Sequence, residues 1–330
     1  MIQSTLKVVV ILSVCLCVML SPAIADEPSP APEGSFSFVV LPDTQAYCTQ
    51  KTSFYFEAEI NWILENRHTQ NIVFVSHVGD IVGDYESDAE WDVARRNILR
   101  LSGTLPFGLS VGNHDMLSSG ESTKFQEAFP ASLFKDRDWY GGQIRNNANS
   151  YQLISAVGRR FLILHLECNA PDDVLTWASD VLERHSDRLA MITTHMYLGP
   201  RDQPRKPRDY FDAPKGRMEW HKTHGESGNT PQQMWEKCFS RYRNVFLICC
   251  GDQSRTQAIH RTVKGRHGNA VHECLSDYRG GYLRIYRFEP SEQRIRVMTY
   301  SPYQQKLCDG TDIVPDVSRH QFTLGYGIRR

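Results

Sequence analysis

The sequence predicts an α/β layered fold with mixed β-sheets, on three observations. Short apolar runs rich in β-branched residues alternate with segments of helical periodicity, which is typical of layered α/β proteins. The runs are continuous, as in strands that are buried on both faces. Two further segments alternate in the manner of hairpins. The six continuous runs cover residues 36–45, 71–84, 106–115, 160–167, 189–197 and 245–254.

Four segments between these runs are predicted to be helices. They cover residues 53–68, 87–101, 171–185 and 230–243. In the second segment Ser87 and Asp88 are candidate N-caps, and in the fourth Thr230 stands before Pro231, which is typical of a helix start. The third segment begins with acidic residues and ends near Arg184, as the helix dipole favours.

The two hairpins make the predicted sheets mixed rather than wholly parallel. The first spans residues 149–167 and turns at 157–159, and the second spans 282–302 and turns at 290–291. Residues 198–229 have no periodicity and are rich in proline, glycine and charge. A loop of this length inside a compact domain is usually functional or mobile.

The N-terminal residues predict export. Lys7 precedes an apolar run, and the small residues Ala-Ile-Ala end at Ala25, as at a signal-peptide cleavage site. The run is short for a membrane span, although an uncleaved anchor is an alternative. We therefore expect a signal peptide over residues 1–25, a flexible Pro-rich linker over 26–35 and a single domain over 36–330. Cleavage near Ala25 would leave the protein periplasmic or extracellular.

Composition excludes some classes of partner. Cleavage removes one lysine and no acid, so the formal net charge changes from −1 to −2. A chain this close to neutral has no overall attraction to nucleic acid or to anionic membranes. The seven cysteines from Cys48 to Cys308 have no C-x-x-C spacing, which is not the pattern of a disulfide framework. An oxidising compartment would still permit one or two disulfides.

Polar side chains that can bind divalent metals follow five of the six apolar runs. They are Asp43 and Gln45, Asp80, Asn113, His114 and Asp115, His195, and Asp252. In open α/β sheets, ligands bind beyond the carboxyl ends of the strands. One aspartate after a strand is usually a turn or cap residue. Five strand ends that carry oxygen and imidazole groups instead predict a metal site.

The order of these residues resembles the calcineurin-like metallophosphoesterases. The matching motifs are Asp43-x-Gln45, Gly79-Asp80, Gly112-Asn113-His114-Asp115, Thr194-His195 and Gly251-Asp252. The segments LPDTQ, RVMTYSPY and QFTL also resemble a secreted bacterial subgroup of that family. The resemblance implies a four-layer metallophosphoesterase-type β-sandwich, in which mixed sheets are flanked by helices and a dinuclear metal centre lies on the strand ends.

By position, the resemblance implies a metal-binding role for four residues. Asp80 would bridge two divalent cations, and Asp43 would hold the first of them. Asn113 and His195 would hold the second. Two cations about 3.5–4 Å apart clamp a phosphate and lower the pKa of a bound water.

The resemblance also implies roles for the next two residues of the GNHD motif. His114 would contact the phosphoryl oxygens or protonate the leaving group, because an imidazole can act as an acid near neutral pH. Asp115 would orient the ring of His114.

The sequence departs from the family at two motifs. Most relatives have Asp-x-His in place of Asp43-Thr44-Gln45, and Gly-His-x-His in place of Gly251-Asp252-Gln253-Ser254. The first metal would therefore have the Gln45 carbonyl instead of an imidazole, and the second would gain a carboxylate if Asp252 coordinates. Such an oxygen-rich site favours Mn²⁺, Mg²⁺ or Ca²⁺ over Zn²⁺. Added negative charge makes a metal-bound water less acidic, so we expect a weakened or partly occupied centre.

Five other histidines are weaker candidates for metal or substrate binding. His267 and His272 could replace a missing ligand, although a surface or packed position is the favoured interpretation. His77 is expected to pack near the site. His221 and His224 in the long loop are expected to be solvated, while the mild basicity of that loop could steer a phosphate.

Together these features predict an exported metal-dependent phosphoesterase that hydrolyses a phosphomonoester or phosphodiester by a metal-bound hydroxide. The alternative is a catalytically weak or inactive relative that binds a phosphorylated or glycan ligand, and a third possibility is a structural Ca²⁺ site. The partner in the first case is a phosphorylated substrate whose identity the fold does not choose.

Overall fold

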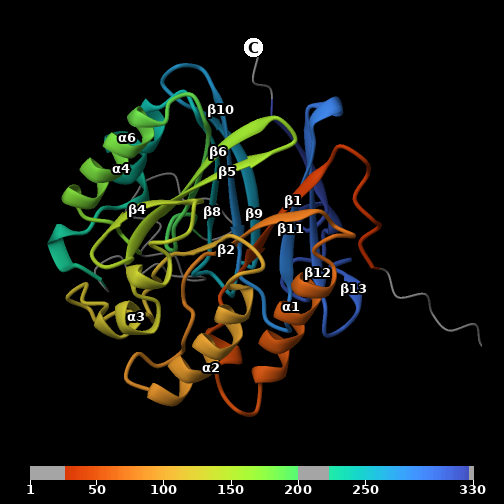
Figure 1. Ribbon diagram of the computed structural model, residues 1–330, viewed down its shortest axis with the longest axis horizontal. Helices are drawn as coiled ribbons and strands as arrows, with labels where there is room; N and C mark the ends of the chain where they lie inside the picture. Colours follow the sequence, from red (N-terminus) through yellow and green to blue (C-terminus); the bar gives the residue numbers. More distant parts are fainter. Residues whose placement is uncertain (1–26, 200–222, 327–330) are drawn as a thin grey trace, which may run out of the picture.

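The computed structural model describes residues 27–199 and 223–326, which form two β-sheets packed face to face (Figure 1). The first sheet has the strand order β13-β12-β11-β1-β2-β3, and β14 also pairs with β12. Its strands are β1 (Phe36–Leu41), β2 (Ile72–His77), β3 (Phe107–Leu109), β11 (Leu283–Glu289), β12 (Arg294–Ser301), β13 (Lys306–Leu307) and β14 (Phe322–Gly325). The predicted signal peptide lies outside the described residues.

The second sheet has the strand order β4-β5-β6-β7-β8-β10-β9. Its strands are β4 (Tyr140–Ile144), β5 (Asn149–Ala156), β6 (Arg159–His165), β7 (Leu189–Thr193), β8 (Val245–Cys250), β9 (Ala258–Lys264) and β10 (Ala270–Ser276). Strands β1, β2 and β3 are parallel, as are β6, β7, β8 and β10, while the remaining pairs are antiparallel. The sheets are therefore mixed, as predicted.

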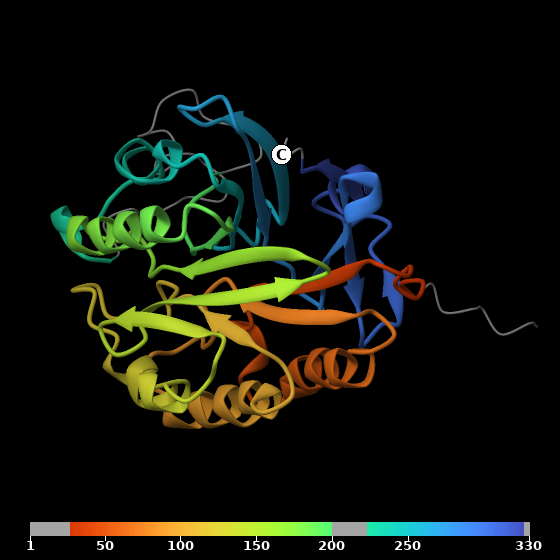
Figure 2. The same cartoon turned by 45° about the horizontal axis from the view of Figure 1, so that its top comes forward.

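Helices cover the outer faces of both sheets (Figure 2). They are α1 (Ser53–Glu65), α2 (Asp88–Ile98) and α3 (Thr123–Ala128) on the first sheet, and α4 (Asp172–Arg184) and α6 (Pro231–Lys237) on the second. The predicted caps are confirmed, because Ser87 accepts a hydrogen bond from the Glu90 amide and Thr230 forms a capping box with Gln233. Within the described residues, no helix is both long and apolar enough to cross a membrane.

The continuous apolar runs exist because each central strand faces apolar residues on both sides. In β1, Phe36, Phe38 and Val40 pack into the core between the sheets, while Val39 and Leu41 pack against the helices. All five side chains are buried. Burial on both faces removes the alternation that a half-exposed strand would show. The predicted four-layer arrangement of helices, sheet, sheet and helices is thus confirmed.

Both predicted hairpins are present. Strands β5 and β6 are joined by Val157 and Gly158, whose φ angles of 47° and 69° place both residues in the left-handed region. This is the backbone of a type I′ turn, and its twist matches that of the flanking strands. Strands β11 and β12 form the second hairpin, which closes through residues 290–293.

Several predicted boundaries were wrong. The helix expected over 230–243 ends at Lys237, and the strands end before the last residues of the six apolar runs. Strands β9 and β10 were not predicted. All seven cysteines from Cys48 to Cys308 are free and buried, so none of them forms a disulfide.

The segment expected to be a flexible linker packs against the domain where it is described. The guanidinium of buried Arg287 donates a 2.7 Å hydrogen bond to the Ser29 carbonyl and another hydrogen bond to Gln70 Oε1. The Ala31 amide also donates to the Thr69 carbonyl. A buried arginine needs acceptors for its donors, and residues 27–35 supply some of them. This part of the predicted linker therefore contacts the domain, and its flexibility stays a prediction.

His165 is a fully buried polar group between the two sheets. Its Nε2 lies 2.8 Å from Ser76 Oγ on β2, and its Nδ1 lies 2.8 Å from Gln152 Oε1 on β5. Burial, together with the nearby His77, lowers the pKa of His165 to about 3. The ring is consequently neutral in the folded protein at pH values where a solvated histidine is charged.

This difference predicts a pH-dependent contribution to stability. Below pH 6.5 the unfolded chain protonates His165 while the folded protein does not, so stability is lost as the pH falls toward 3. A His165→Gln variant lacks this proton uptake. We expect the stability advantage of the wild type over this variant to shrink by about 2 kcal/mol between pH 7 and pH 5. Urea denaturation at both pH values measures it, and a constant difference would contradict the assignment.

Candidate metal centre

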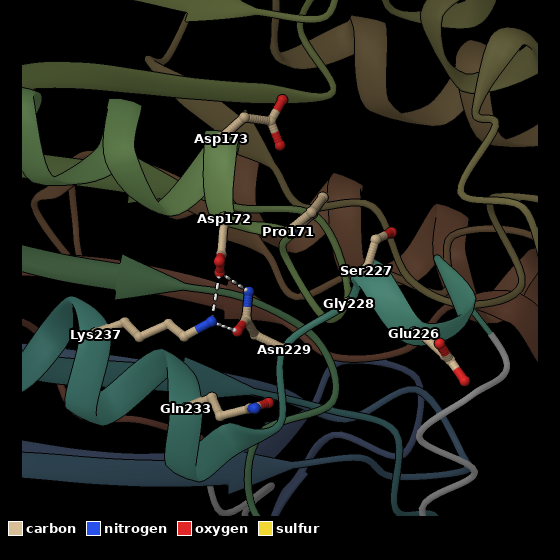
Figure 3. A pocket seen from close by; sticks show the side chains of 9 residues that line it. All are labelled: Pro171, Asp172, Asp173, Glu226, Ser227, Gly228, Asn229, Gln233 and Lys237. Carbon is tan, nitrogen blue, oxygen red and sulfur yellow. Dashed lines mark hydrogen bonds and ion pairs between the residues drawn. The ribbon is translucent and has the colours of Figure 1, made fainter.

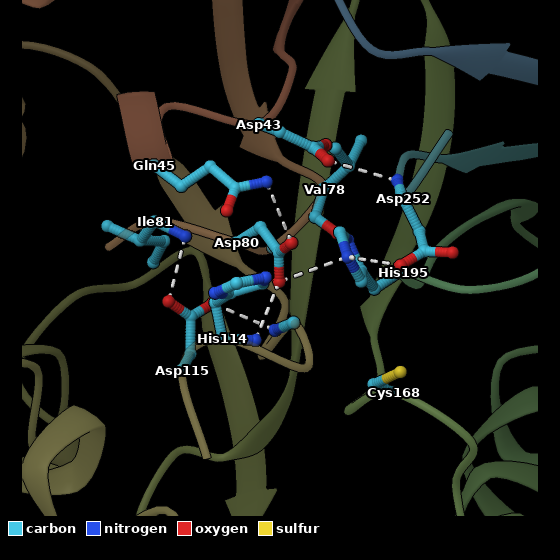
Figure 4. Close-up of polar contacts among 12 residues, drawn as sticks. Asp43, Gln45, Val78, Asp80, Ile81, His114, Asp115, Cys168, His195 and Asp252 are labelled. Carbon is cyan, nitrogen blue, oxygen red and sulfur yellow. Dashed lines mark hydrogen bonds and ion pairs between the residues drawn. The ribbon is translucent and has the colours of Figure 1, made fainter. Parts of the chain in front are cut away.

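The carboxyl ends of parallel strands from both sheets bring the predicted residues together (Figure 4). Asp43, Asp80 and Asn113 follow β1, β2 and β3 of the first sheet, while His195 and Asp252 follow β7 and β8 of the second. Ligand atoms of Asp43, Asp80 and His195 all lie within 4.8 Å of one another, and all three residues are buried. The expectation that these strand ends converge is confirmed.

Asp80 lies at the middle of the cluster. Its Oδ1 accepts a 2.9 Å hydrogen bond from the His114 amide, and its Oδ2 accepts a 3.1 Å hydrogen bond from Gln45 Nε2. The same Oδ1 lies 3.1 Å from His195 Nε2. Asp80 has a φ of 51°, an unusual angle for a residue other than glycine. The loop after β2 thus holds this carboxylate between groups from both sheets.

His195 has the orientation of a metal ligand. Its Nδ1 lies 3.0 Å from the Val78 carbonyl, which can only accept a hydrogen bond. In the neutral ring this contact puts the proton on Nδ1 and leaves the lone pair of Nε2 directed at the cluster. Asp252 Oδ1 lies 3.7 Å from that Nε2, on the other side from Asp80.

The donor set fits a divalent cation. Three buried polar atoms of the cluster lack a hydrogen-bond partner, namely Asp43 Oδ1, Asn113 Oδ1 and His195 Nε2. Buried polar atoms are normally hydrogen-bonded, so unpaired ones at a single place call for an explanation. A carboxylate, an amide carbonyl and an imidazole are all metal-binding groups, and a bound cation would satisfy the three atoms together.

The pKa shifts of the clustered residues also favour a bound cation. Burial raises the pKa of Asp43 well above its ordinary value, and the charge of Asp277 raises it further. Burial also acts on Asp80, but the adjacent His195 brings the pKa of Asp80 below its ordinary value. Burial opposes protonation of His195, yet Asp80 and Asp43 raise its pKa well above the ordinary value. The buried carboxylates therefore need positive charge nearby, which a divalent cation would supply.

Asp252 and Gln45 lie where the sequence predicted them. The Asp252 amide donates a 3.0 Å hydrogen bond to Asp43 Oδ2, and the Asp252 carboxylate accepts a 2.7 Å hydrogen bond from Gln253 Nε2. Gln45 directs its amide nitrogen at Asp80. Coordination of a metal by Asp252 or by the Gln45 carbonyl stays a prediction.

The role predicted for Asp115 was wrong. Asp115 does not orient the His114 ring, whose Nδ1 lies 2.8 Å from the Gly83 carbonyl instead. The buried Asp115 carboxylate accepts hydrogen bonds from the amides of Ile81, Val82 and Gly112 at 2.8, 3.1 and 2.8 Å. It thereby ties the loop after β2 to the loop after β3. Its contribution is to hold these loops together.

Asp277 is a further buried acid whose charge acts on Asp43, and sequence reasoning missed it. It directly follows β10, is 4% exposed and is the strongest charged neighbour of Asp43. Burial raises the pKa of Asp277 to about 7. The signal was present, because Asp277 is one more aspartate at the end of a strand. It was overlooked because β10 carries a His and a Glu and does not read as a continuous apolar run.

The remaining histidines lie away from the ligand atoms. His77 packs behind the site against Thr44 Oγ1, as expected. His267 pairs with the Arg241 carbonyl and His272 with the Gly325 carbonyl, in agreement with the favoured surface or packed interpretation. His224 is buried, with its Nε2 3.5 Å from Glu167 Oε2, so the expectation that it is solvated was wrong. His221 and the basic residues of the long loop lie outside the described residues.

A separate cavity of about 330 Å³ opens at the start of α4 (Figure 3). Two of its charged groups pair, because Lys237 Nζ lies 2.6 Å from Asp172 Oδ1, and Lys237 also donates to Asn229 Oδ1 at 2.7 Å. Asn229 Nδ2 completes the triangle by donating to Asp172 Oδ1 at 2.8 Å. None of the candidate metal ligands lines this cavity.

No family model matches the chain, but comparison with known proteins finds similar sequences and structures. An uncharacterised protein of Bacillus subtilis, YvnB, is 29% identical over 293 residues, which is 85% of this chain and 21% of YvnB. The chain thus spans about a fifth of the length of this curated relative. The purple acid phosphatase PPD1 of yellow lupin has a TM-score of 0.55 at 12% identity, covering 91% of this chain and 55% of that chain. A 5′-nucleotidase precursor of Thermus thermophilus has a TM-score of 0.47 at 13% identity, covering 83% and 53%.

The similarity to the lupin phosphatase concerns the fold, because 12% identity carries no information on substrate. In this chain the fold consists of two mixed sheets flanked by helices, with the metal-ligand side chains gathered at the strand ends. This chain has a fold of the metallophosphoesterase type.

Proposed function

We propose that the chain is an exported, metal-dependent phosphoesterase that hydrolyses a phosphomonoester or a phosphodiester. One observation carries the proposal: the ligand atoms of Asp43, Asp80 and His195 cluster within 4.8 Å in a buried site on a metallophosphoesterase-type fold. Export rests on the apolar N-terminal run that ends at Ala25.

Different residues of the chain would bind metal and donate a proton. Asp43, Asp80 and His195 would hold divalent cations, and Asn113 would add a neutral oxygen. When bound, such cations polarise a phosphoryl group and activate water for attack. The Gly83 carbonyl fixes the ring of His114 through Nδ1, so a proton on Nε2 is the one available to the leaving oxygen. Among the described residues, His195 is the single imidazole of the metal-capable group, and the other candidate ligands are oxygens, which favours Mn²⁺, Mg²⁺ or Ca²⁺ over Zn²⁺.

A second candidate is a ligand-binding protein with little or no catalytic activity. The observation in its favour is the replacement of imidazoles by Gln45 and Asp252 at positions beside the cluster. Extra negative charge makes a metal-bound water less acidic and slows hydrolysis. The same scaffold would then bind a phosphorylated or glycan ligand without turning it over.

The decisive experiment is hydrolysis of mono- and bis-p-nitrophenyl phosphate by metal-depleted protein with added Mn²⁺, Mg²⁺, Ca²⁺ or Zn²⁺. We expect activity that is highest with Mn²⁺. His114→Ala should reduce turnover by about 100-fold without loss of Mn²⁺ binding, because a proton donor is removed and no metal ligand is. The exposed His267 provides the matched control, and His267→Ala should leave turnover unchanged.

Each result separates the candidates. If no metal supports hydrolysis although the cations still bind, the proposal of a phosphoesterase is refuted and the ligand-binding protein is favoured. Thermal stabilisation by Ca²⁺ alone, with no hydrolysis and no effect of His114→Ala, would indicate a structural calcium site.

A further inference from the structure

Exposed aromatic side chains gather at the edge of the first sheet where β12 ends. Among the described residues, the large hydrophobic side chains that are exposed belong to Phe54, Tyr303, Val157 and Val317. Phe54 and Tyr303 are 40% and 51% exposed, and their ring centroids lie 4.9 Å apart. Single exposed hydrophobic side chains are normal, whereas a contiguous group of them often marks a binding site. The pairing of two exposed rings from distant segments therefore calls for an explanation.

Tyr55 adds a third ring to this pair. It is half-buried, and its ring centroid lies 4.4 Å from that of Phe54 and 4.7 Å from that of Tyr303. Beneath it, the centroid of the buried Tyr47 ring lies 5.2 Å from that of Tyr55. Rings at these separations attract one another beyond the effect of burial alone. Phe54, Tyr55 and Tyr303, here called the aromatic patch, thus form an ordered surface with a ring packed beneath it.

Hydrogen bonds fix the turn that carries Tyr303. The Gln304 amide donates to Ser301 Oγ at 3.2 Å, and Ser301 Oγ donates to the Gly280 carbonyl at 2.9 Å. The Gln304 side chain also donates through Nε2 to the Gly280 carbonyl at 3.2 Å, and its Oε1 accepts from Tyr282 OH at 3.3 Å. The turn after β12 is therefore tied to the segment that leads into β11.

The topology of the first sheet places the aromatic patch on the same edge as the candidate metal centre. Strands β1 and β12 run parallel, because each is antiparallel to β11, which lies between them. Asp43 stands two residues after the end of β1, and Tyr303 stands two residues after the end of β12. Neighbouring strands are about 4.8 Å apart, so these two strand ends are separated by roughly 10 Å. One small ligand can span that distance.

A short loop also links the aromatic patch to the candidate metal centre. Gln45 Nε2 donates a 3.1 Å hydrogen bond to Asp80 Oδ2. Two residues later in the same 3₁₀ turn, Tyr47 supports the ring of Tyr55. Tyr47 OH also accepts a 2.8 Å hydrogen bond from the Gly281 amide. The same turn therefore contacts the metal-ligand cluster on one side and the base of the patch on the other.

The chemistry of the aromatic patch favours an aromatic ring as its ligand. Sugar hydroxyls that leave water need hydrogen-bond partners, but the carboxamide of Gln304, which follows Tyr303, is already bound at both ends. An aromatic ring needs no such partners and packs on other rings in offset or edge-to-face geometry. The exposed Arg279, directly before Gly280, adds a guanidinium that can stack on an aromatic plane and attract an anionic ligand.

We propose that the aromatic patch binds a planar aromatic ring of the substrate while the candidate metal centre holds the phosphate of the same molecule. The inference rests on the proposed function and narrows its substrate class to phosphoesters that carry an aromatic ring, such as a nucleotide. Tyr303 determines specificity and does not touch the reacting atoms.

The test compares adenosine 5′-monophosphate with ribose 5-phosphate, which has the same phosphate but no aromatic ring. Binding to the full chain loaded with Mn²⁺ is measured by isothermal titration calorimetry in the His114→Ala background, in which slow turnover keeps both ligands intact. Adenosine 5′-monophosphate should bind at least about fivefold more tightly, because a base gains this much from stacking on an aromatic side chain. Tyr303→Ala should remove most of this preference without changing the affinity for ribose 5-phosphate, whereas Tyr303→Phe should retain the preference.

Val317→Ala is the matched control, because Val317 is 49% exposed but lies outside the aromatic patch, and it should keep the preference. Equal affinities for the two ligands, no binding of adenosine 5′-monophosphate, or a preference that survives Tyr303→Ala would overturn the inference. A dimer that Tyr303→Ala dissociates, without any preference for the base, would instead assign the patch to an interface between copies. A Tyr303-dependent preference in a protein that hydrolyses no phosphoester would refute the proposed function and leave the ring site intact. Hydrolysis without that preference would refute only the ring site.

Discussion

Asp80→Asn is expected to reduce metal-dependent hydrolysis by about three orders of magnitude or more, which corresponds to about 4 kcal/mol of transition-state stabilisation. The reason is the central position of this carboxylate. It faces His195 at 3.1 Å and receives hydrogen bonds from Gln45 and the His114 amide. A carboxamide has nearly the same shape but lacks the charge that attracts a cation, so Mn²⁺ binding should fall together with turnover.

The measurement pairs p-nitrophenyl phosphate turnover with Mn²⁺ titration. Asp92→Asn is the matched control, because Asp92 is an exposed aspartate on α2 and its replacement removes the same charge. An Asp80→Asn variant that retained both turnover and Mn²⁺ affinity would show that the chemistry takes place elsewhere.

Gly112→Ala is expected to lower the free energy of unfolding by about 1–3 kcal/mol and to weaken Mn²⁺ binding. A Cβ at position 112 would overlap the backbone nitrogen and Oδ1 of Asp80 and lie 2.8 Å from its Cα. Backbone cannot move aside as the end of a flexible side chain can. The Gly112 amide also donates to Asp115, which anchors the loop on the other side. A methyl group would therefore displace the Asp80 carboxylate.

Chemical denaturation and Mn²⁺ titration measure the two effects. Gly325→Ala is the control, because a Cβ at that position meets no atom within 4 Å. Its stability and Mn²⁺ affinity should match those of the wild type. Equal behaviour of the two variants would contradict the close packing of Gly112 on Asp80.

Many features of the fold could be predicted because their causes are local. Ser87 and Thr230 cap helices through residues three positions away, and the turn at Val157 and Gly158 closes a hairpin between adjacent strands. The positions of Asp80 and His195 at strand ends could also be predicted from the sequence, because an apolar run that stops at polar groups marks the end of a buried strand.

The relations between distant segments could not be predicted in this way. Asp115 was expected to contact its neighbour His114, but it binds amides of the loop after β2 that come close only when β2 and β3 pair. Residues 27–35 look like a linker until Arg287, far along the chain, is buried against them.

The sequence by itself determined which side chains stand at strand ends and therefore the kind of chemistry available, because burial on both faces imposes a continuous apolar pattern on each strand. Only the tertiary structure decided which of those ends meet. Asp43 and His195 meet because β1 of one sheet and β7 of the other end at the same place. Strand order and register depend on contacts between residues far apart in sequence, and the local pattern carries no record of them.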